Sequence, residues 1–248
     1  MQLTERQRIR IEKLRRRGKS SEEIAEKLGL DQAAVAAVLA NITREKEMKK
    51  VKKRLLIVEC TSESEEDKSE SSLLIELIRI LEPTPMELRI VKVRGRSGFL
   101  RELENSNELC IHISAHGKHR KGKRARGTFI YFPSGKRVDT NDLKRVWAGR
   151  SISKKPRLVV LSACETGHQD MARALYEAGC RYFIAPVHDT YWFDAAIFLT
   201  IFYRLLFVEG HGPWVAFKKT DYALKRIFPN LTGAWSFYDR GQKILYEE

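Results

Sequence analysis

The spacing of apolar residues along the chain changes near residue 54. Before that point, apolar positions recur three or four residues apart within charged stretches, which is typical of short helices. After it, short runs rich in β-branched residues alternate with longer helical patterns. Strands that alternate with helices indicate a parallel sheet with right-handed crossovers. The pattern therefore predicts a small all-α unit followed by an α/β domain.

Short apolar runs mark the predicted strands, and their nearly continuous hydrophobicity is typical of strands buried on both faces. These runs are 54–60, 86–93, 108–114, 157–163 and 181–187. Helical patterns occupy 71–82, 168–179 and 190–208. The segment 127–140 instead predicts a hairpin that turns at Ser134 and Gly135, inserted between the third and fourth strands.

The longest apolar stretch, 191–208, is interrupted by Asp194 and Arg204. Each charge near the centre of a bilayer costs roughly 2.5–3.5 kcal/mol on insertion scales. The stretch is therefore better explained as a buried crossover helix than as a membrane span. The amino terminus is charged from the start and lacks the apolar run of a secretory signal, so we expect a cytoplasmic protein without membrane contact.

Three short helices are expected at the start of the chain. Ser20 and Glu23 have the spacing of a capping box, Gly29 provides a turn, and Asp31 caps the last helix. Helices joined by such a glycine turn are typical of the helix-turn-helix. We therefore predict a helix-turn-helix-like adaptor domain at 1–42, a charged linker at 43–53 and a second domain at 54–248.

The basic charge of the chain is concentrated at this end. The formal net charge is +14, and residues 1–54 hold 16 Lys and Arg against 8 Asp and Glu. This excess favours an acidic or nucleic-acid partner. However, the available positions of the last helix, including Gln32, Ala33 and Ala36, offer few donors to base edges. We therefore expect residues 1–42 to dock on a protein or to self-associate as an oligomer. Nonspecific nucleic-acid contact and specific DNA recognition are the alternatives.

A histidine and a cysteine stand at the ends of two predicted strands. Cys164 follows the run 157–163, and His116 follows the run 108–114. If the two strands are neighbours, both side chains emerge at the carboxyl edge of the sheet, where open α/β sheets bind ligands. A thiolate attacks and an imidazole manages its proton, so the pair is a candidate nucleophile and base. The backbone N–H groups of Gly117 and Cys164 would form an oxyanion hole.

These residues resemble a known family. "HISAHG", followed about 45 residues later by "VVLSACETG" and then by "MARALYEAGCRYFIAPV", is similar to the CHAT-type caspase-like cysteine peptidases, a group that also includes caspases, metacaspases and separases. The resemblance covers roughly 52–247 and implies a caspase-hemoglobinase fold, a mostly parallel sheet flanked by helices. It implies His116 as general acid and base, Cys164 as nucleophile, the Gly117 and Cys164 amides at the oxyanion, no third catalytic side chain and no cofactor. The closing "WSFYDRG" resembles the last strand of the family.

The resemblance also implies what such a thiol protease acts on. Stand-alone peptidases of this kind resemble effectors of bacterial immunity and programmed death, so the expected substrate is a specific partner protein and the expected setting is antiviral defence. Two alternatives stay open. One is a DNA-binding regulator whose caspase-like domain senses or scaffolds, and the other is a non-proteolytic module of a larger complex.

Some relatives that cleave after Arg or Lys place carboxylates in the pocket for the residue before the cut. In the loop after the fifth strand, Asp189 is the first candidate for this role and Asp194 the second, although Asp189 is equally suited to cap the next helix. Ser162 stands where those relatives have another acid, two residues before the cysteine. Tyr191 and Trp192 would instead line an apolar pocket.

Three other patterns carry weaker implications. The basic segment 118–126 is interpreted as a solvated loop, with an exosite for acidic substrates, an RNA contact and a self-cleavage segment as alternatives. The acidic segment 61–70 is interpreted as a surface loop. His112 and His116 lie on a predicted strand with no third ligand, and the cysteines form no C-x-x-C pair, so we expect neither a metal nor disulfides.

Overall fold

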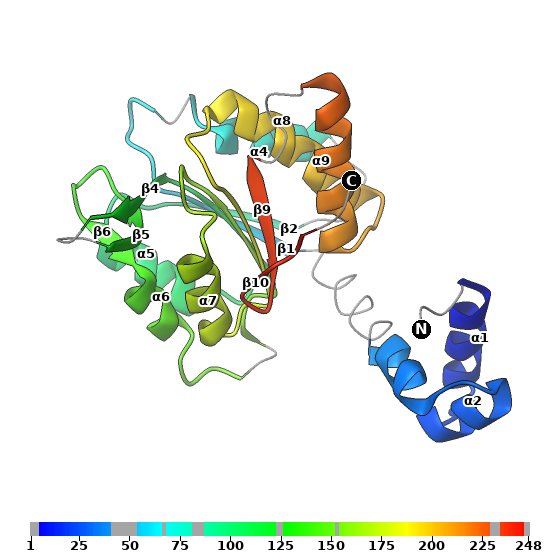
Figure 1. The fold of residues 1–248 in the computed structure, drawn as a ribbon. Helices are drawn as coiled ribbons and strands as arrows, with labels where there is room; N and C mark the ends of the chain where they lie inside the picture. Colours follow the sequence, from blue (N-terminus) through cyan, green and yellow to red (C-terminus); the bar gives the residue numbers. More distant parts are fainter. Residues whose placement is uncertain are drawn as a thin grey trace. The chain divides into compact units, whose positions relative to one another are not determined.

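The computed structural model describes residues 5–40, 54–65, 68–80, 87–122, 126–151, 154–228 and 234–245. The chain divides into two compact units, Met1–Lys50 and Val51–Glu248, which are described separately (Figure 1). The linker predicted at 43–53 lies outside the described residues.

The first unit contains helix α1 (Glu5–Arg16), helix α2 (Ser21–Leu28) and a helical stretch over 32–40. The Ser20 hydroxyl accepts the Glu23 N–H at 3.2 Å, and the Glu23 carboxylate accepts the Ser20 N–H at 2.7 Å, so the expected capping box is present. Gly29 ends α2 with a φ of 63°, in the left-handed region that glycine favours. The helices lie where the sequence predicts them, and their use as a helix-turn-helix stays a prediction.

A small apolar core holds these helices together. It consists of Ile11, Leu14, Ile24, Ala25 and Val35, one or two from each helix. The side chains of Gln32, Ala33, Ala36 and Ala37 are exposed on the last helical stretch. Three of these four exposed residues are alanines, so this surface carries few long side chains.

The second unit is built on a seven-stranded sheet with the strand order β10-β9-β8-β7-β3-β1-β2. Strands β1 to β8 of this sheet run parallel, and β9 is antiparallel to β8 and β10 to β9. The bounds are β1 Arg54–Glu59, β2 Glu87–Lys92, β3 Cys110–Ser114, β7 Leu158–Ser162, β8 Tyr182–Pro186, β9 Trp235–Asp239 and β10 Gln242–Lys243. All five predicted strands are present, and the predicted α/β fold with a mostly parallel sheet is confirmed.

Helices cover both faces of this sheet (Figure 1). On one face lie α4 (Glu70–Ile80), α8 (Trp192–Tyr203) and α9 (Pro213–Ile227), and on the other lie α5 (Arg96–Asn105), α6 (Thr140–Val146) and α7 (Gln169–Ala178). This double cover explains why every residue of β3 and β7 is buried.

The predicted buried helix is present as α8, which continues into a π-helical turn at Arg204–Val208. It is not the crossover expected from the sequence, because the next strand, β9, is antiparallel to β8. The ring of Phe198 in this helix stacks on the ring of Trp235 in β9, with 4.4 Å between the ring centroids. In the part of the chain that the structure describes, no helix has the length and apolarity needed to span a membrane.

A second, three-stranded sheet corrects the interpretation of the basic segment. Strand β4 (His116–Lys121) pairs with β5 (Arg126–Tyr131), which pairs with β6 (Arg137–Asp139), all antiparallel. The predicted hairpin turning at Ser134 and Gly135 is therefore confirmed as β5 and β6, but residues 118–121 form a strand and not a loop. Their polar side chains carry no hydrophobic pattern, so only the pairing with β5 shows the strand. Residues 123–125 lie outside the described part.

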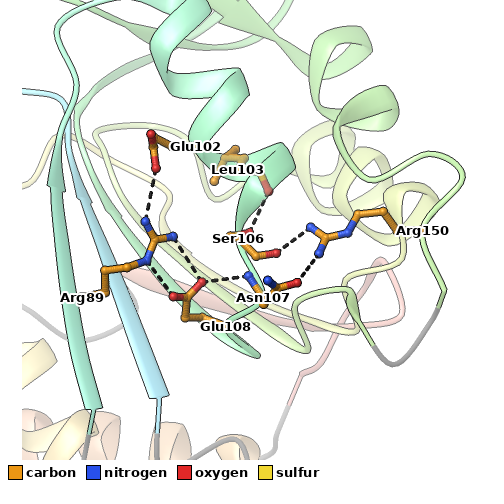
Figure 2. A network of polar contacts seen from close by, with 7 residues as sticks. All are labelled: Arg89, Glu102, Leu103, Ser106, Asn107, Glu108 and Arg150. Atoms are coloured by element: carbon orange, nitrogen blue, oxygen red, sulfur yellow. Dashed lines mark hydrogen bonds and ion pairs between the residues drawn. The ribbon is translucent and has the colours of Figure 1, made fainter.

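A polar network fixes the entry to β3 (Figure 2). Arg89 of β2 donates to Glu108 at 2.7 Å and to Glu102 of α5 at 3.2 Å. Arg150, after α6, donates to the Ser106 carbonyl at 2.5 Å. The segment between α5 and β3 is thus held from both sides, which fixes the start of the strand that leads to His116.

Candidate active site

Strand pairing brings His116 and Cys164 to the same edge of the sheet. Parallel strands β3 and β7 pair with Ser114 opposite Ser162, and the Ala115 N–H donates to the Ser162 carbonyl at 3.1 Å. His116 and Cys164 each lie two residues beyond that pair. The neighbour relation assumed from the sequence is confirmed, and both residues leave the sheet at one level of its carboxyl edge.

Gly117 lies against the turn that carries Cys164. A Cβ at position 117 would be 2.5 Å from the Cys164 carbonyl oxygen and 2.9 Å from the Ala163 Cβ. Because the first of these atoms belongs to the backbone, only a residue without a side chain permits the approach. The turn is closed by a hydrogen bond of 2.6 Å from the Thr166 hydroxyl to the Ala163 carbonyl.

The Cys164 thiol is partly exposed and faces the loop after β8. Its Sγ lies 3.4 Å from the Thr190 backbone nitrogen and 3.5 Å from the Thr190 carbonyl oxygen. The next residue, Glu165, has a φ of 51°, which is uncommon for a residue with a side chain. Such conformations are often found at functional sites.

The other three cysteines have a different environment. Cys60, Cys110 and Cys180 are buried, and burial raises the pKa of each thiol, that of Cys180 to about 12. These thiols stay protonated and shielded from reagents at neutral pH. Cys164 is therefore the most accessible thiol of the four.

The His116 imidazole is half exposed and lies between two side chains from other segments. Its ring centroid is 5.8 Å from that of Trp192, and its Nε2 is 3.0 Å from Glu65 Oε1. Glu65 belongs to the segment after β1 that the sequence presents as an acidic surface loop. The sequence analysis missed this contact, because Glu65 lies 51 positions from His116 and no local pattern marks it.

The Glu65 carboxylate is itself hydrogen-bonded. Its Oε2 accepts the Ser62 hydroxyl at 2.6 Å and the Ser62 backbone N–H at 3.0 Å. These bonds and the contact with His116 hold the pKa of Glu65 below its ordinary value of 4.5. The carboxylate is therefore ionised at neutral pH.

The predicted substrate-binding residues lie in different settings. Asp189 and Tyr191 flank Thr190. The side chain of Asp189 is 75% exposed, and the whole residue Tyr191 is 82% exposed. Ser162 is buried at the end of β7. Lys118 of β4 forms an ion pair with Glu165 and lies 3.8 Å from Asp189, and the hydrogen bond to Glu165 is the main cause that raises the pKa of Lys118.

The first histidine of the H-x-x-x-H spacing lies in the core. His112 is fully buried in β3, with Nδ1 2.9 Å from the Tyr203 hydroxyl and Nε2 3.5 Å from Glu70 Oε1. Across the described residues, no group of three His, Cys, Asp or Glu side chains is placed to hold a metal ion.

One comparison with known proteins, the family model, agrees with the motif resemblance. A model of the CHAT domain family matches residues 10–220. No curated protein matches the chain. Among solved structures, an inactive zymogen of a C11 protease from Parabacteroides distasonis is similar, with 12% identity and a TM-score of 0.48 over 76% of this chain and 62% of that one. The chain thus spans less than two thirds of that protease.

Gly117→Ala tests the close approach of the two strand ends. The added methyl meets backbone, so we expect the free energy of unfolding to fall by about 1–3 kcal/mol and the rate of Cys164 alkylation by iodoacetamide to change. Gly212→Ala is the control, since a Cβ there meets nothing within 4 Å, and its cost should stay below about 1 kcal/mol. Urea unfolding and mass spectrometry measure both effects. Equal rates of Cys164 alkylation in Gly117→Ala and Gly212→Ala would contradict the close packing of Gly117 against the Cys164 turn.

Proposed function

Because the chain belongs to the CHAT domain family, we propose that it is a caspase-like cysteine endopeptidase that cleaves a partner protein through His116 and Cys164. One observation carries the proposal. The register of β3 against β7 delivers these two residue types to the same level of one sheet edge.

In the proposed reaction, His116 removes the proton of the Cys164 thiol, and the thiolate attacks the scissile carbonyl carbon. The oxyanion that forms accepts hydrogen bonds from the Gly117 and Cys164 N–H groups. His116 then gives the proton to the leaving amine as the C–N bond breaks and a thioester remains. Water, deprotonated by the same imidazole, hydrolyses the thioester and releases the acid and the free thiol.

The surroundings of the thiol support this role. The Thr190 backbone N–H lies 3.4 Å from Sγ and can donate a hydrogen bond to it. The partial exposure of Cys164 leaves it open to a peptide, whereas the other three thiols are buried. The setting in bacterial immunity or programmed death rests on the family resemblance alone.

Substitution of either member of the pair tests the proposed chemistry. Cys164→Ala and His116→Ala should each abolish cleavage of a peptide library, and the double variant should be no worse, because the two groups act as one unit. Circular dichroism should show an unchanged fold. Cys180→Ala is a matched control at a buried thiol, expected to keep its activity. Full cleavage by Cys164→Ala would refute the proposal.

A second proposal concerns the residue before the cut. We propose that Asp189 selects Arg or Lys there, since its exposed carboxylate lies near a lysine ammonium, Lys118, at 3.8 Å. Asp189→Ala should reduce cleavage after basic residues and leave other cleavage unchanged, whereas Asp194→Ala should have no such effect. Profiling with a mixed peptide library measures both. An unchanged profile in Asp189→Ala would favour an apolar pocket formed by Tyr191 and Trp192.

The helical unit is proposed as a docking module for a protein partner or a second copy of the chain. The exposed alanines of its last helical stretch allow close packing, which a long charged side chain would prevent. Ala36→Arg should therefore weaken a partner complex or an oligomer while cleavage of small peptides continues. Light scattering and partner pull-down measure the association, with Lys27→Arg as a charge-conserving control. If a DNA selection experiment recovered a single tight, salt-resistant site, it would instead favour the alternative function as a DNA-binding regulator.

A further inference from the structure

The loop between β1 and α4 places a carboxylate on the imidazole of the proposed active site. Glu65 Oε1 is 3.0 Å from His116 Nε2, and the Glu65 side chain is 31% exposed. The two residues are 51 positions apart in the sequence. A contact of this kind does not arise from local sequence, so the fold of the loop has to create it.

The loop is anchored at both ends to one buried acid. Glu59, the last residue of β1, is 2% exposed, and its Oε1 accepts the Thr61 hydroxyl at 3.1 Å and the Ser69 hydroxyl at 2.5 Å. The two residues that frame the loop are thus bonded to the same carboxylate oxygen. This arrangement fixes the loop to the sheet strand beside β3, which leads to His116.

Within the loop, the two oxygens of Glu65 have separate partners. Oε2 accepts both hydrogen bonds from Ser62, at 2.6 and 3.0 Å, and Oε1 faces the imidazole. The bonds from Ser62 therefore orient the Glu65 carboxylate independently of its contact with His116. Glu59 thus holds the loop through Thr61 and Ser69, and Ser62 orients Glu65 within it.

An ionised carboxylate only accepts hydrogen bonds, so the hydrogen between these atoms must belong to Nε2. A neutral imidazole with its hydrogen on Nε2 has its lone pair on Nδ1. The contact thus selects one of the two tautomers. It also places a negative charge where it stabilises the imidazolium that forms when the ring takes a proton.

We propose that Glu65 is a positioning residue that holds His116 in the Nε2–H tautomer, with Nδ1 as the nitrogen that exchanges the proton with Cys164. The kinetic consequence of this proposal rests on the peptidase function proposed above. The tautomer itself does not depend on that function. Glu65 thereby adds a carboxylate to a site that the sequence presents as a histidine and a cysteine alone.

The test uses the full-length chain with Glu65→Ala and Glu65→Gln. Glu63→Gln is the matched control, because Glu63 lies on the same loop and pairs with the exposed Arg94 instead of the histidine. The ¹⁵N spectrum of histidine-labelled protein reports the tautomer of each ring, and His116→Ala assigns the signal. We expect the Nε2–H form of His116 in the wild type and in Glu63→Gln, and a mixture of tautomers in Glu65→Ala.

The kinetic part measures kcat and KM separately on the peptide that the wild type cleaves best. Glu65→Ala should lower kcat about 10- to 100-fold, part of the 10²–10⁴-fold that a positioned acid–base group contributes, and leave KM unchanged. The amide oxygen of Glu65→Gln still accepts a hydrogen bond from Nε2–H but carries no charge. The kcat of this variant should therefore lie between that of Glu65→Ala and that of the wild type.

Two results would overturn the proposal. The first is a wild-type His116 with its hydrogen on Nδ1. The second is a Glu65→Ala protein whose kcat matches or exceeds that of the wild type, which would mean that the Glu65 contact does not assist catalysis by His116. If the wild type cleaves no peptide, the peptidase function fails by itself. The tautomer spectra then still decide whether Glu65 orients the ring.

Discussion

The pairing of β3 with β7 is the constraint on which the candidate site depends. Hydrogen bonds between parallel strands fix the relative position of the two chains residue by residue, and a slip by one residue would turn every side chain to the other face. Both faces of these strands are buried under helices, so a slip is excluded by packing as well. The places of His116 and Cys164 at the sheet edge therefore follow from the core.

The approach of Gly117 to Cys164 is a second consequence of this pairing. Since β4 begins at His116, the three-stranded sheet starts where β3 ends, and its residue Gly117 lies on the turn that carries Cys164. Lys118 and His119 of the same strand both contact the Glu165 carboxylate, the lysine by its ammonium and the histidine by its backbone N–H at 3.1 Å. The small sheet and the cysteine turn thus form one connected structure, although they are far apart in sequence.

The sequence predicted the parts of the fold whose pattern is local. The strands β1, β3 and β7 are continuous apolar runs, because both their faces are buried, and Ser20 with Glu23 marks the start of α2 by side-chain chemistry alone. The sequence could not show that β3 and β7 are neighbours, since a strand run carries no mark of its partner. It named His116 and Cys164 from their places at strand ends and from the family motif.

What the sequence missed depends on contacts between distant segments. Strand β4 has no apolar alternation, because its outward side chains are Lys, His and Arg and its partner is β5. Helices α5 and α6 also went unpredicted, since each is short and more than half of its residues are charged or polar. Glu65 lies among other acids and serines that resemble a solvated loop. Only the burial of Glu59, Thr61 and Ser69 distinguishes this loop from one that is merely exposed.

The position of Lys118 has a consequence for any cation that approaches the site. Its ammonium is held by Glu165 and lies near Asp189, and the strand that carries it starts at His116. A group attached to the same chain competes at a high effective concentration, because it does not have to be captured from solution. A free basic side chain would have to displace this tethered competitor. If Asp189 binds basic side chains as proposed, a basic segment of a docked protein would compete with Lys118 better than a free side chain, because it too would be held close to the site.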